Sequence, residues 1–347
     1  MSELFDKHLH NATLMRWMLF APLLSKSLRV VVELDVPDLL AAAPRPLADL
    51  AAVTGTDPVS LRRLLRGLAM FDVFEEPAEG VFALAPLGRT LCRDTPGSAR
   101  PSALLVSGVV GTTWAALDRT VRTGRPVFDE LFGDDFFDYL DHNPEVARVF
   151  SASQAEGLVL ELDEILGVAD FSSYRTIVDV GGGDGAFLIK LLERNPAARG
   201  ILFELSATAT LGAKRVAAQG LAERCEVVAG DFFDSVPAGG DAYLLSHVLH
   251  DWGDADAARI LRTCARAIPA HGTLIVVDLI TAEYGSGDSG YEYAGLLDLY
   301  MLSLFGGGGG HERNASEFTG LLESAGFTDV RIRRLPSGMG FIEARLG

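Results

Sequence analysis

The hydrophobic positions of the chain follow one pattern before residue 174 and another after it. In the first part, apolar residues recur at helical spacing, as over residues 11–43, and residues 101–170 are also predicted to be mainly helical. In the second part, short apolar runs alternate with helical stretches. The runs predict strands at 176–180, 200–205, 225–231, 241–249 and 273–280, with helices near 185–195, 207–219, 255–268 and 314–325. Such alternation predicts an α/β fold with a doubly wound, Rossmann-like sheet.

The last residues predict a hairpin that completes this sheet. Residues 330–346 form two apolar runs on either side of Pro336, Ser337 and Gly338. Proline and glycine at this spacing favour a tight turn between two strands. We therefore expect a terminal antiparallel strand in an otherwise parallel sheet.

The first hundred residues predict a separate domain. A helix over 46–55, a second helix after Asp57 and two short strands over 75–86 follow one another in the order of a winged helix. We expect a mainly helical, winged-helix-like dimerisation domain at 1–100. Residues 101–347 would then form a helical lid or linker followed by the Rossmann-like catalytic domain.

A winged helix can bind DNA or serve as a dimer interface. Arg62, Arg63 and Arg66 on its second helix favour DNA, but 30 basic against 47 acidic residues give a net charge of −17, which repels nucleic acid and anionic membranes. Residues 13–23 are too apolar for a free arm and need a partner surface. We therefore expect a homodimer with no nucleic-acid partner. A DNA-binding regulator is the less favoured alternative.

Composition and cysteine spacing argue against a secreted, zinc-binding or membrane protein. The three cysteines, Cys92, Cys225 and Cys264, are too few and too widely spaced for a disulfide framework or a CxxC zinc site. The first residues lack the basic start of a signal peptide. The longest apolar stretch, 104–117, is shorter than the roughly 20 residues of a membrane span. We expect a cytoplasmic protein with no membrane partner.

A glycine-rich turn follows the first strand of the second part. Gly181, Gly183 and Ala186 match a dinucleotide fingerprint, but Asp184 at the start of the next helix would repel a pyrophosphate. Asp179 and Asp184 instead suit a cation at the carboxyl edge of the sheet, where ligands bind. S-adenosylmethionine carries a cationic sulfonium and an amino group. The charges therefore favour S-adenosylmethionine over NAD.

The next two strand ends also carry acids. Glu204 follows Gly183 by 21 residues and can accept hydrogen bonds from both ribose hydroxyls. Asp231 can accept from an adenine amino group while Phe232 packs against the ring. These positions complete a predicted nucleoside site.

The fourth strand end carries a candidate general base, His250. Either Asp278, at the end of the fifth strand, or Glu312 could accept its other ring N–H. Asp251 is adjacent in sequence, so we expect it to point elsewhere and to begin a helix. His247 and His250 are three residues apart, but no third ligand is evident in the sequence, and we expect no metal site.

Four motifs together carry a family resemblance. They are DVGGGDG (179–185), GDFF (230–233), HVLHDWGD (247–254) and GGHERNASEF (309–318). In combination they resemble the plant- and bacterial-type small-molecule O-methyltransferases, which use S-adenosylmethionine. That family also has an N-terminal winged-helix dimerisation domain, so the resemblance extends over most of the chain.

The resemblance implies a role for each matching residue. The cofactor would contact Asp179, Gly181, Gly183, Glu204, Asp231, Phe232, Ser246 and Trp252. The base would be His250, flanked by Asp278 and Glu312. The acceptor pocket would include Phe150, Gln154, His247 and Met301. Apart from the resemblance, the apolar segment 13–23 predicts that Trp17 and Phe20 approach the acceptor pocket of the partner in the dimer.

The resemblance also implies the reaction. We expect transfer of a methyl group to a hydroxyl of an aromatic, polyketide-type natural product. Two departures keep an alternative open: Gln154 stands where a methionine is frequent, and the glycine run 306–310 is about three residues longer than usual. The alternative is a relative that binds the cofactor but catalyses hydroxylation, decarboxylation or ring formation.

Overall fold

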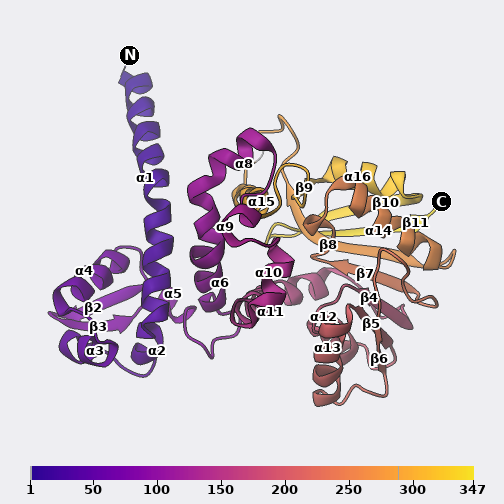
Figure 1. Ribbon diagram of the computed structural model, residues 1–347, viewed down its shortest axis with the longest axis horizontal. Helices are drawn as coiled ribbons and strands as arrows, with labels where there is room; N and C mark the ends of the chain where they lie inside the picture. The colour runs from indigo at the N-terminus through magenta and orange to yellow at the C-terminus, as the bar shows by residue number, and fades with distance from the viewer. Residues whose placement is uncertain (1, 288) are drawn as a thin grey trace. The chain divides into compact units, whose positions relative to one another are not determined.

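A computed structural model describes residues 2–287 and 289–347, with side chains from residue 10 onward. Contacts within the chain divide it into two compact units (Figure 1). The first unit takes the chain up to Ala115 together with Phe137–Val159. The second unit consists of Ala116–Phe136 and Leu160–Gly347.

The first unit opens with two helices rather than one continuous helical stretch. Its early elements are α1 (Ser2–Glu33), α2 (Val36–Leu40), β1 (Arg45–Pro46), α3 (Leu47–Thr54), α4 (Pro58–Ala69), β2 (Phe74–Ala78) and β3 (Val81–Leu84). The apolar pattern over 11–43 is interrupted at Asp35, whose left-handed φ of 54° ends α1 and precedes α2.

The predicted winged helix is confirmed. Gly55 ends α3 with a φ of 65°, and the side chain of Asp57 accepts a hydrogen bond from the Ser60 N–H at the start of α4. The hairpin β2–β3 follows, and β1 pairs with β3 in a three-stranded sheet. Arg66, one of the three arginines on α4, makes two hydrogen bonds to Glu76 of this hairpin. That arginine is therefore already paired within the protein.

The stretch between the two sheets is mainly helical, as expected. It contains α5 (Pro86–Arg89), α6 (Arg100–Leu105), the π-helix η1 (Val106–Val110), α7 (Gly111–Thr113), the 3₁₀ turn η2 (Trp114–Ala116), α8 (Leu117–Thr123), α9 (Phe128–Phe132), α10 (Phe136–His142) and α11 (Pro144–Val168). Pro144 is the first residue of α11, where its missing N–H costs nothing.

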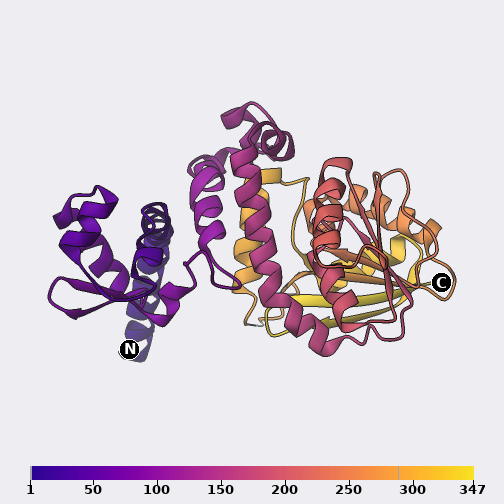
Figure 2. The ribbon, with the colours of Figure 1, turned by 90° about the horizontal axis from the view of Figure 1, so that it is seen from below.

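The second unit holds the predicted mixed sheet. Its strands are β4 (Thr176–Val180), β5 (Arg199–Glu204), β6 (Cys225–Ala229), β7 (Ala242–Ser246), β8 (Thr273–Thr281), β9 (Arg313–Asn314), β10 (Phe327–Arg334) and β11 (Met339–Leu346). Its order is β10-β11-β8-β7-β4-β5-β6, and β9 pairs with β8. Strands β4 to β8 run parallel, whereas β11 is antiparallel to both neighbours, β8 and β10. Figure 2 shows the long hairpin that β10 and β11 form.

Helices cover both faces of this sheet (Figure 1). They are α12 (Ala186–Arg194), α13 (Ser206–Ala218), α14 (Asp254–Ala267), α15 (Glu292–Phe305), α16 (Ala315–Ser324) and the 3₁₀ turn η3 (Leu249–Asp251). Val178 and Val180 of β4 share a core with α14 and α16. On the other face, a Cβ added at Gly200 of β5 would lie 2.9 Å from Leu188 of α12. Glycine there lets α12 approach the sheet closely.

One predicted strand is too long, and the difference matters for the site. We expected a strand over 241–249, but β7 ends at Ser246. His247 has a left-handed φ of 54°, which turns the chain out of the strand and into η3. His250 therefore lies in the short turn η3, beyond the carboxyl end of β7.

An exposed apolar stripe lies along α1. It consists of Leu14, Met15, Trp17, Met18, Leu19, Phe20 and Leu23, each more than half exposed. Trp17 packs edge-on against Phe71 within the same unit, yet it keeps 63% of its surface exposed. All three cysteines are buried and free, as expected. No helix in the described part of the chain is long and apolar enough to cross a membrane.

Candidate active site

The carboxyl ends of four parallel strands bring the predicted site residues to one edge of the sheet. Asp179 lies in β4, Glu204 ends β5, Ser246 ends β7 and Asp278 lies in β8. Because β4 pairs with both β5 and β7, and β7 with β8, these ends are neighbours. The site is therefore built from four strand ends that extend from Asp179 to Asp278 in the sequence and are held side by side by three strand pairings.

The glycine turn needs its glycines for two separate reasons. Gly181 and Gly183 have φ values of 70° and 58°, a conformation that side chains disfavour. Gly182 is needed for space: an added Cβ would lie 2.4 Å from the carboxyl carbon of Asp179. The turn thus lies directly against the Asp179 carboxylate. The sequence motif alone does not reveal this role of Gly182.

Two carboxylates under this turn are poorly solvated. Asp179 is fully buried, and neither of its oxygens makes a hydrogen bond of ordinary geometry within the described residues. Burial and the nearby charge of Glu204 raise the pKa of Asp179 to about 7, and the N–H of Leu188 offsets only part of this. Burial also raises the pKa of Glu204. Glu204 accepts a hydrogen bond from the Gly183 N–H at 3.3 Å. Burial thus disfavours the charged form of both carboxylates, and a positively charged ligand would stabilise that form.

Asp184 does not belong to this pair, contrary to our expectation. Its carboxylate forms an ion pair with Arg215 of α13 and accepts a hydrogen bond from the Ala186 N–H at the start of α12. Arg215 neutralises the charge that we expected to repel a pyrophosphate. The charge preference for a cationic cofactor therefore rests on Asp179 and Glu204.

The adenine-side residues gather around an aromatic cluster. Rings of Phe232 and Trp252 lie 5.9 Å apart and those of Phe233 and Trp252 4.8 Å apart, all edge-to-face. Asp231 accepts a hydrogen bond from the Phe233 N–H, which shapes the turn after β6. A Cβ added at Gly181 would lie 3.5 Å from Phe232, so this cluster adjoins the glycine turn.

The candidate base is held by one of its two predicted partners. Nδ1 of His250 donates to Oε1 of Glu312 at 3.0 Å, and His250 is only 6% exposed. Glu312 is fixed in turn, because its backbone N–H donates to Asp298 of α15 at 3.0 Å. This arrangement selects the tautomer that leaves Nε2 of His250 free to accept a proton. Asp298 was not found from the sequence.

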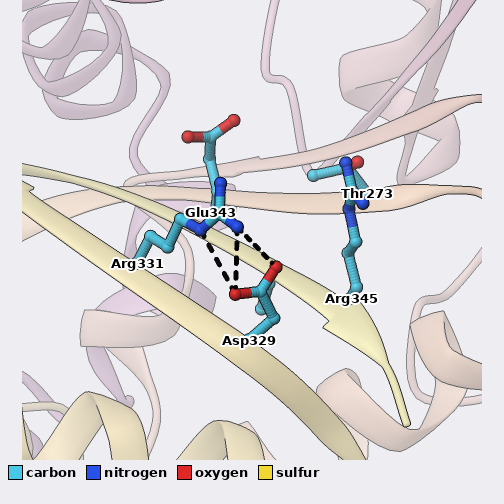
Figure 3. Close-up of a pocket in the computed structure, with 6 residues that line it drawn as sticks. Thr273, Asp329, Arg331, Glu343 and Arg345 are labelled. Carbon is cyan, nitrogen blue, oxygen red and sulfur yellow. Dashed lines mark hydrogen bonds and ion pairs between the residues drawn. The ribbon is translucent and has the colours of Figure 1, made fainter.

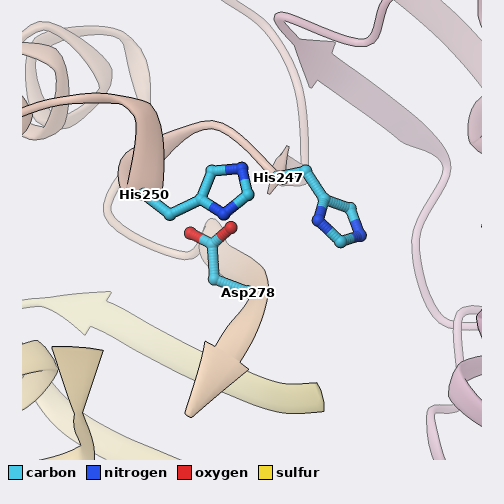
Figure 4. Close-up of side chains that lie close together, drawn as sticks. All are labelled: His247, His250 and Asp278. Carbon is cyan, nitrogen blue, oxygen red and sulfur yellow. The ribbon is translucent and has the colours of Figure 1, made fainter. Parts of the chain in front are cut away.

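Asp278 and Asp251 also lie close to His250. Asp278 is fully buried, neither of its oxygens has a hydrogen-bond partner among the described residues, and Figure 4 shows its carboxylate facing the ring of His250. Burial raises the pKa of Asp278 to about 6, although both histidines oppose this. Asp251 does not point elsewhere, as we expected: its Oδ1 is 3.7 Å from Nε2 of His250, because both residues lie in the tight turn η3.

The acids around His250 affect its pKa more strongly than burial does. Burial lowers the pKa of His250, but the charges of Glu312, Asp251 and Asp278 raise it well above its usual value. His247 is also paired with an acid: its Nε2 donates a hydrogen bond to Oε2 of Glu161 of α11 at 2.8 Å. Glu161 is a site residue that no motif in the sequence marks.

A second missed residue fixes the turn that carries the base. Arg313 is completely buried, and its guanidinium donates to the carbonyls of Leu249 and Trp252 and to Asp254. It thus holds the backbone on both sides of His250. The signal in the sequence is its place directly after Glu312.

The structure brings a third possible ligand to the two histidines, which the sequence did not reveal, and the expectation of no metal site stays untested. His247, His250 and Asp278 each offer one ligand atom, and these atoms lie within 4.8 Å of one another. The sequence could not show this, because Asp278 comes from a different strand.

The residues predicted for the acceptor pocket are divided between the two units. Trp17, Phe20, Phe150 and Gln154 belong to the first unit, whereas His247 and Met301 belong to the second. Met301 of α15 is buried. Their shared role in acceptor binding stays a prediction.

A small pocket elsewhere does not compete for this role. It measures about 20 Å³ and lies against Thr273, Asp329, Arg331, Glu343 and Arg345 (Figure 3). Thr273 begins β8, so the pocket adjoins the amino end of that strand, opposite the carboxyl edge. It is too small for a nucleoside.

Comparison with known proteins agrees with this geometry. Residues 114–328 match the O-methyltransferase domain model, and residues 18–94 match the O-methyltransferase dimerisation domain model. The chain belongs to the O-methyltransferase family.

Two relatives and one solved structure are similar to this chain over nearly its whole length. The chain is 52% identical to the O-methyltransferase SfmM3 of Streptomyces lavendulae, over 95% of this chain and 99% of that protein. It is 40% identical to the phenazine O-methyltransferase PhzM of Lysobacter antibioticus, over 92% of each chain. The O-methyltransferase NcsB1 from neocarzinostatin biosynthesis, solved with S-adenosylmethionine and 2-hydroxy-5-methyl naphthoic acid, matches at a TM-score of 0.77 and 32% identity, over 93% of this chain and 96% of that one.

These findings confirm the main predictions about fold and chemistry. The O-methyltransferase has the expected Rossmann-like sheet and winged-helix region, and it is an enzyme that uses S-adenosylmethionine as methyl donor. Methyl transfer is favoured over the non-methylating alternative, because the relatives above are O-methyltransferases. The match with a dimerisation domain favours the interpretation of the winged helix as an assembly element over the DNA-binding alternative.

Proposed function

We propose that this O-methyltransferase methylates a phenolic hydroxyl of an aromatic natural product, with His250 as general base. The observation that carries the proposal is the position of His250 between two parts of the cofactor side. Val248, two residues before it, would lie 3.1 Å from a Cβ at Gly181, and Trp252, two residues after it, packs against Phe232. A base on this turn is therefore beside the glycine turn and the aromatic cluster. The substrate class is supported by the relatives named for phenazine and solved with a naphthoic acid.

The cofactor-side residues fit a sulfonium nucleoside. The buried carboxylate of Asp179 and the half-buried carboxylate of Glu204 would face its positive groups and ribose, and Phe232 and Trp252 offer aromatic rings to its base. Ser246, whose buried Oγ lacks a hydrogen-bond partner within the described residues, supplies a further polar contact. When bound, S-adenosylmethionine supplies a methyl group on a positively charged sulfur that leaves as a neutral thioether.

His250 acts on the acceptor. Glu312 accepts the Nδ1 proton, so the lone pair of Nε2 takes the proton of the acceptor hydroxyl as its oxygen bonds to the methyl carbon. Asp278 and Asp251 stabilise the imidazolium that results. Because the donor is already activated, the remaining contribution is orientation of the two reactants.

We also propose that the enzyme works as a homodimer in the cytoplasm. Residues 1–100 would form the dimerisation domain and 101–347 the lid and catalytic domain, with Trp17 and Phe20 reaching the acceptor pocket of the partner. The exposed apolar stripe on α1 supports the dimer, and three unpaired cysteines support a reducing compartment.

One assay tests the reaction directly. The purified enzyme is incubated with S-adenosylmethionine and a panel of phenols and aromatic acids, and S-adenosylhomocysteine and product mass are measured together. We expect acceptor-dependent release of S-adenosylhomocysteine with an equal amount of a methylated product. A hydroxylated or decarboxylated product without S-adenosylhomocysteine would overturn the proposal.

A further inference from the structure

Three side chains beside the sheet edge, among them the proposed base His250, together form a metal-ligand set that methyl transfer itself does not require. His247, His250 and Asp278 point toward one another in Figure 4, and one ligand atom from each lies within 4.8 Å of the other two. Two imidazoles and one carboxylate are a donor set that suits zinc, cobalt, nickel or iron. Metal–ligand bonds of 2.0–2.2 Å around a tetrahedral ion need ligand atoms about 3.5 Å apart. The three ligand atoms would therefore have to move about 1 Å closer to one another to bind an ion.

Both imidazoles are already oriented by carboxylates that are not part of the triad. Glu312 accepts from Nδ1 of His250 at 3.0 Å, and Glu161 accepts from Nε2 of His247 at 2.8 Å. Metal-binding histidines commonly donate their second N–H to a carboxylate in this way, which fixes the ring and makes it a better ligand. Here each ring retains one nitrogen outside these two bonds.

The third ligand is buried and lacks a partner. Both oxygens of Asp278 are without a hydrogen bond within the described residues, although the side chain is fully buried. An unpaired buried carboxylate is costly and is relieved by a cation. Four carboxylates, those of Glu161, Asp251, Asp278 and Glu312, surround only two imidazoles, so the local field favours a divalent ion.

The backbone also holds His247 in an unusual position. Its φ of 54° lies in the left-handed region, which non-glycine residues adopt only at a cost. This conformation ends β7 early and places His247 and His250 with their ring centroids 5.5 Å apart.

We propose that His247, His250 and Asp278 form a binding site for a divalent transition-metal ion, such as Zn²⁺ or Co²⁺, which inhibits the enzyme by occupying the base. Methyl transfer needs no such ion. The inhibition rests on the proposed function of His250, whereas the binding does not. The site makes this enzyme sensitive to free transition metal, and a chelator reverses that effect.

Cobalt binding tests the site without reference to activity. Full-length protein without a histidine tag is titrated with Co²⁺, and the visible absorption of the bound ion is followed. We expect one ion per chain and bands of four- or five-coordinate cobalt. His247→Ala should weaken binding at least tenfold, while His271→Ala, which changes a largely exposed histidine 3.6 Å from Asp241, should leave it unchanged. Equal binding by wild type and His247→Ala, or no absorption band in the wild type, overturns the site.

Two further measurements keep the test decisive. Glu161→Gln retains all three ligands and removes only the carboxylate that orients His247, so we expect severalfold weaker cobalt binding even if His247→Ala fails to fold. Unchanged cobalt affinity of Glu161→Gln would contradict the proposed geometry. In the activity assay, Zn²⁺ should inhibit the wild type, and chelation should restore turnover. Full turnover with the ion bound would overturn the inhibitory role while leaving methyl transfer intact.

Discussion

Glu312 holds Nδ1 of His250 from a position 62 residues further along the chain, at 3.0 Å and with its own side chain fully buried. The pairing joins two loops at the carboxyl edge of the sheet, one after β7 and one before β9. It fixes which nitrogen of His250 remains available to the acceptor, and this orientation leads to the first prediction.

Glu312→Gln should lower turnover more than Asp278→Asn does. The amide of glutamine can present its NH₂ group to Nδ1 and thereby select the wrong tautomer, whereas Asp278 contributes charge without a hydrogen bond in the described structure. Both losses should be smaller than that of His250→Ala. Steady-state kinetics with saturating S-adenosylmethionine measures them, and a larger loss for Asp278→Asn would show that charge rather than orientation dominates.

Arg313 should matter for stability as well as for activity. Arg313→Met leaves the buried carbonyl of Leu249 and the part-buried carbonyl of Trp252 without their donor, and the stranded buried group costs about 1–3 kcal/mol. We expect a lower unfolding midpoint in urea and a lower kcat. Arg331→Met is the matched control, because Arg331 is exposed and forms its ion pair with Asp329 at the surface. Similar midpoints for the two variants would contradict the role given to Arg313.

Much of this arrangement could be predicted from the sequence, because strand ends in a parallel sheet share one edge. That rule predicts that Asp179, Glu204 and Asp278 lie at the same edge of the sheet, and the structure has them there. The rule cannot predict side-chain partners from other segments. Glu161 comes from α11 and Asp298 from α15, and neither is part of a motif.

The errors have the same physical origin. Asp184 is in the glycine motif, yet Arg215 from the next helix takes its charge. Asp251 was expected to begin a helix and point elsewhere, but it lies with His250 in the tight turn η3, so its Oδ1 is 3.7 Å from Nε2 of His250. The pattern of apolar residues reports neither tertiary contacts nor the geometry of a tight turn, so it could not predict where these two side chains point.

The buried carboxylate of Asp179 is predicted to lower the free energy of unfolding while strengthening cofactor binding. A carboxyl whose pKa rises from 3.8 to about 7 on folding costs the protein stability as the pH increases through that window, by at most about 4 kcal/mol. Asp179→Asn should therefore raise the unfolding free energy of the cofactor-free enzyme at pH 8 but not at pH 4.

The same variant should bind S-adenosylmethionine more weakly, because it has lost a negative charge near the cationic ligand. Thermal unfolding with and without ligand at both pH values measures the two effects. Asp170→Asn, which alters an exposed acid, is the control and should show no gain at pH 8. A gain that is equal at pH 4 and pH 8 would contradict the raised pKa.

The α1 stripe predicts the assembly state. Trp17 and Phe20 are 63% and 68% exposed, so charged substitutions there should break a dimer without harming the fold. Light scattering should report a dimer for the wild type and a monomer for the Trp17→Glu, Phe20→Glu double variant. Val53→Glu changes another exposed apolar residue, on α3, and should remain dimeric. A monomeric wild type at micromolar concentration would refute the proposed assembly.

Turnover of His250→Ala on a weakly acidic phenol tests the central claim most directly. If His250 takes the proton of the acceptor, this variant should keep its affinity for S-adenosylhomocysteine and lose turnover by about 10²- to 10⁴-fold. His250→Gln should do no better, because an amide cannot accept a proton at neutral pH. The loss should shrink for more acidic phenols, which need the base less, and His271→Ala should keep full activity. Near-full turnover of His250→Ala on the weakly acidic phenol would show that His250 is not the base.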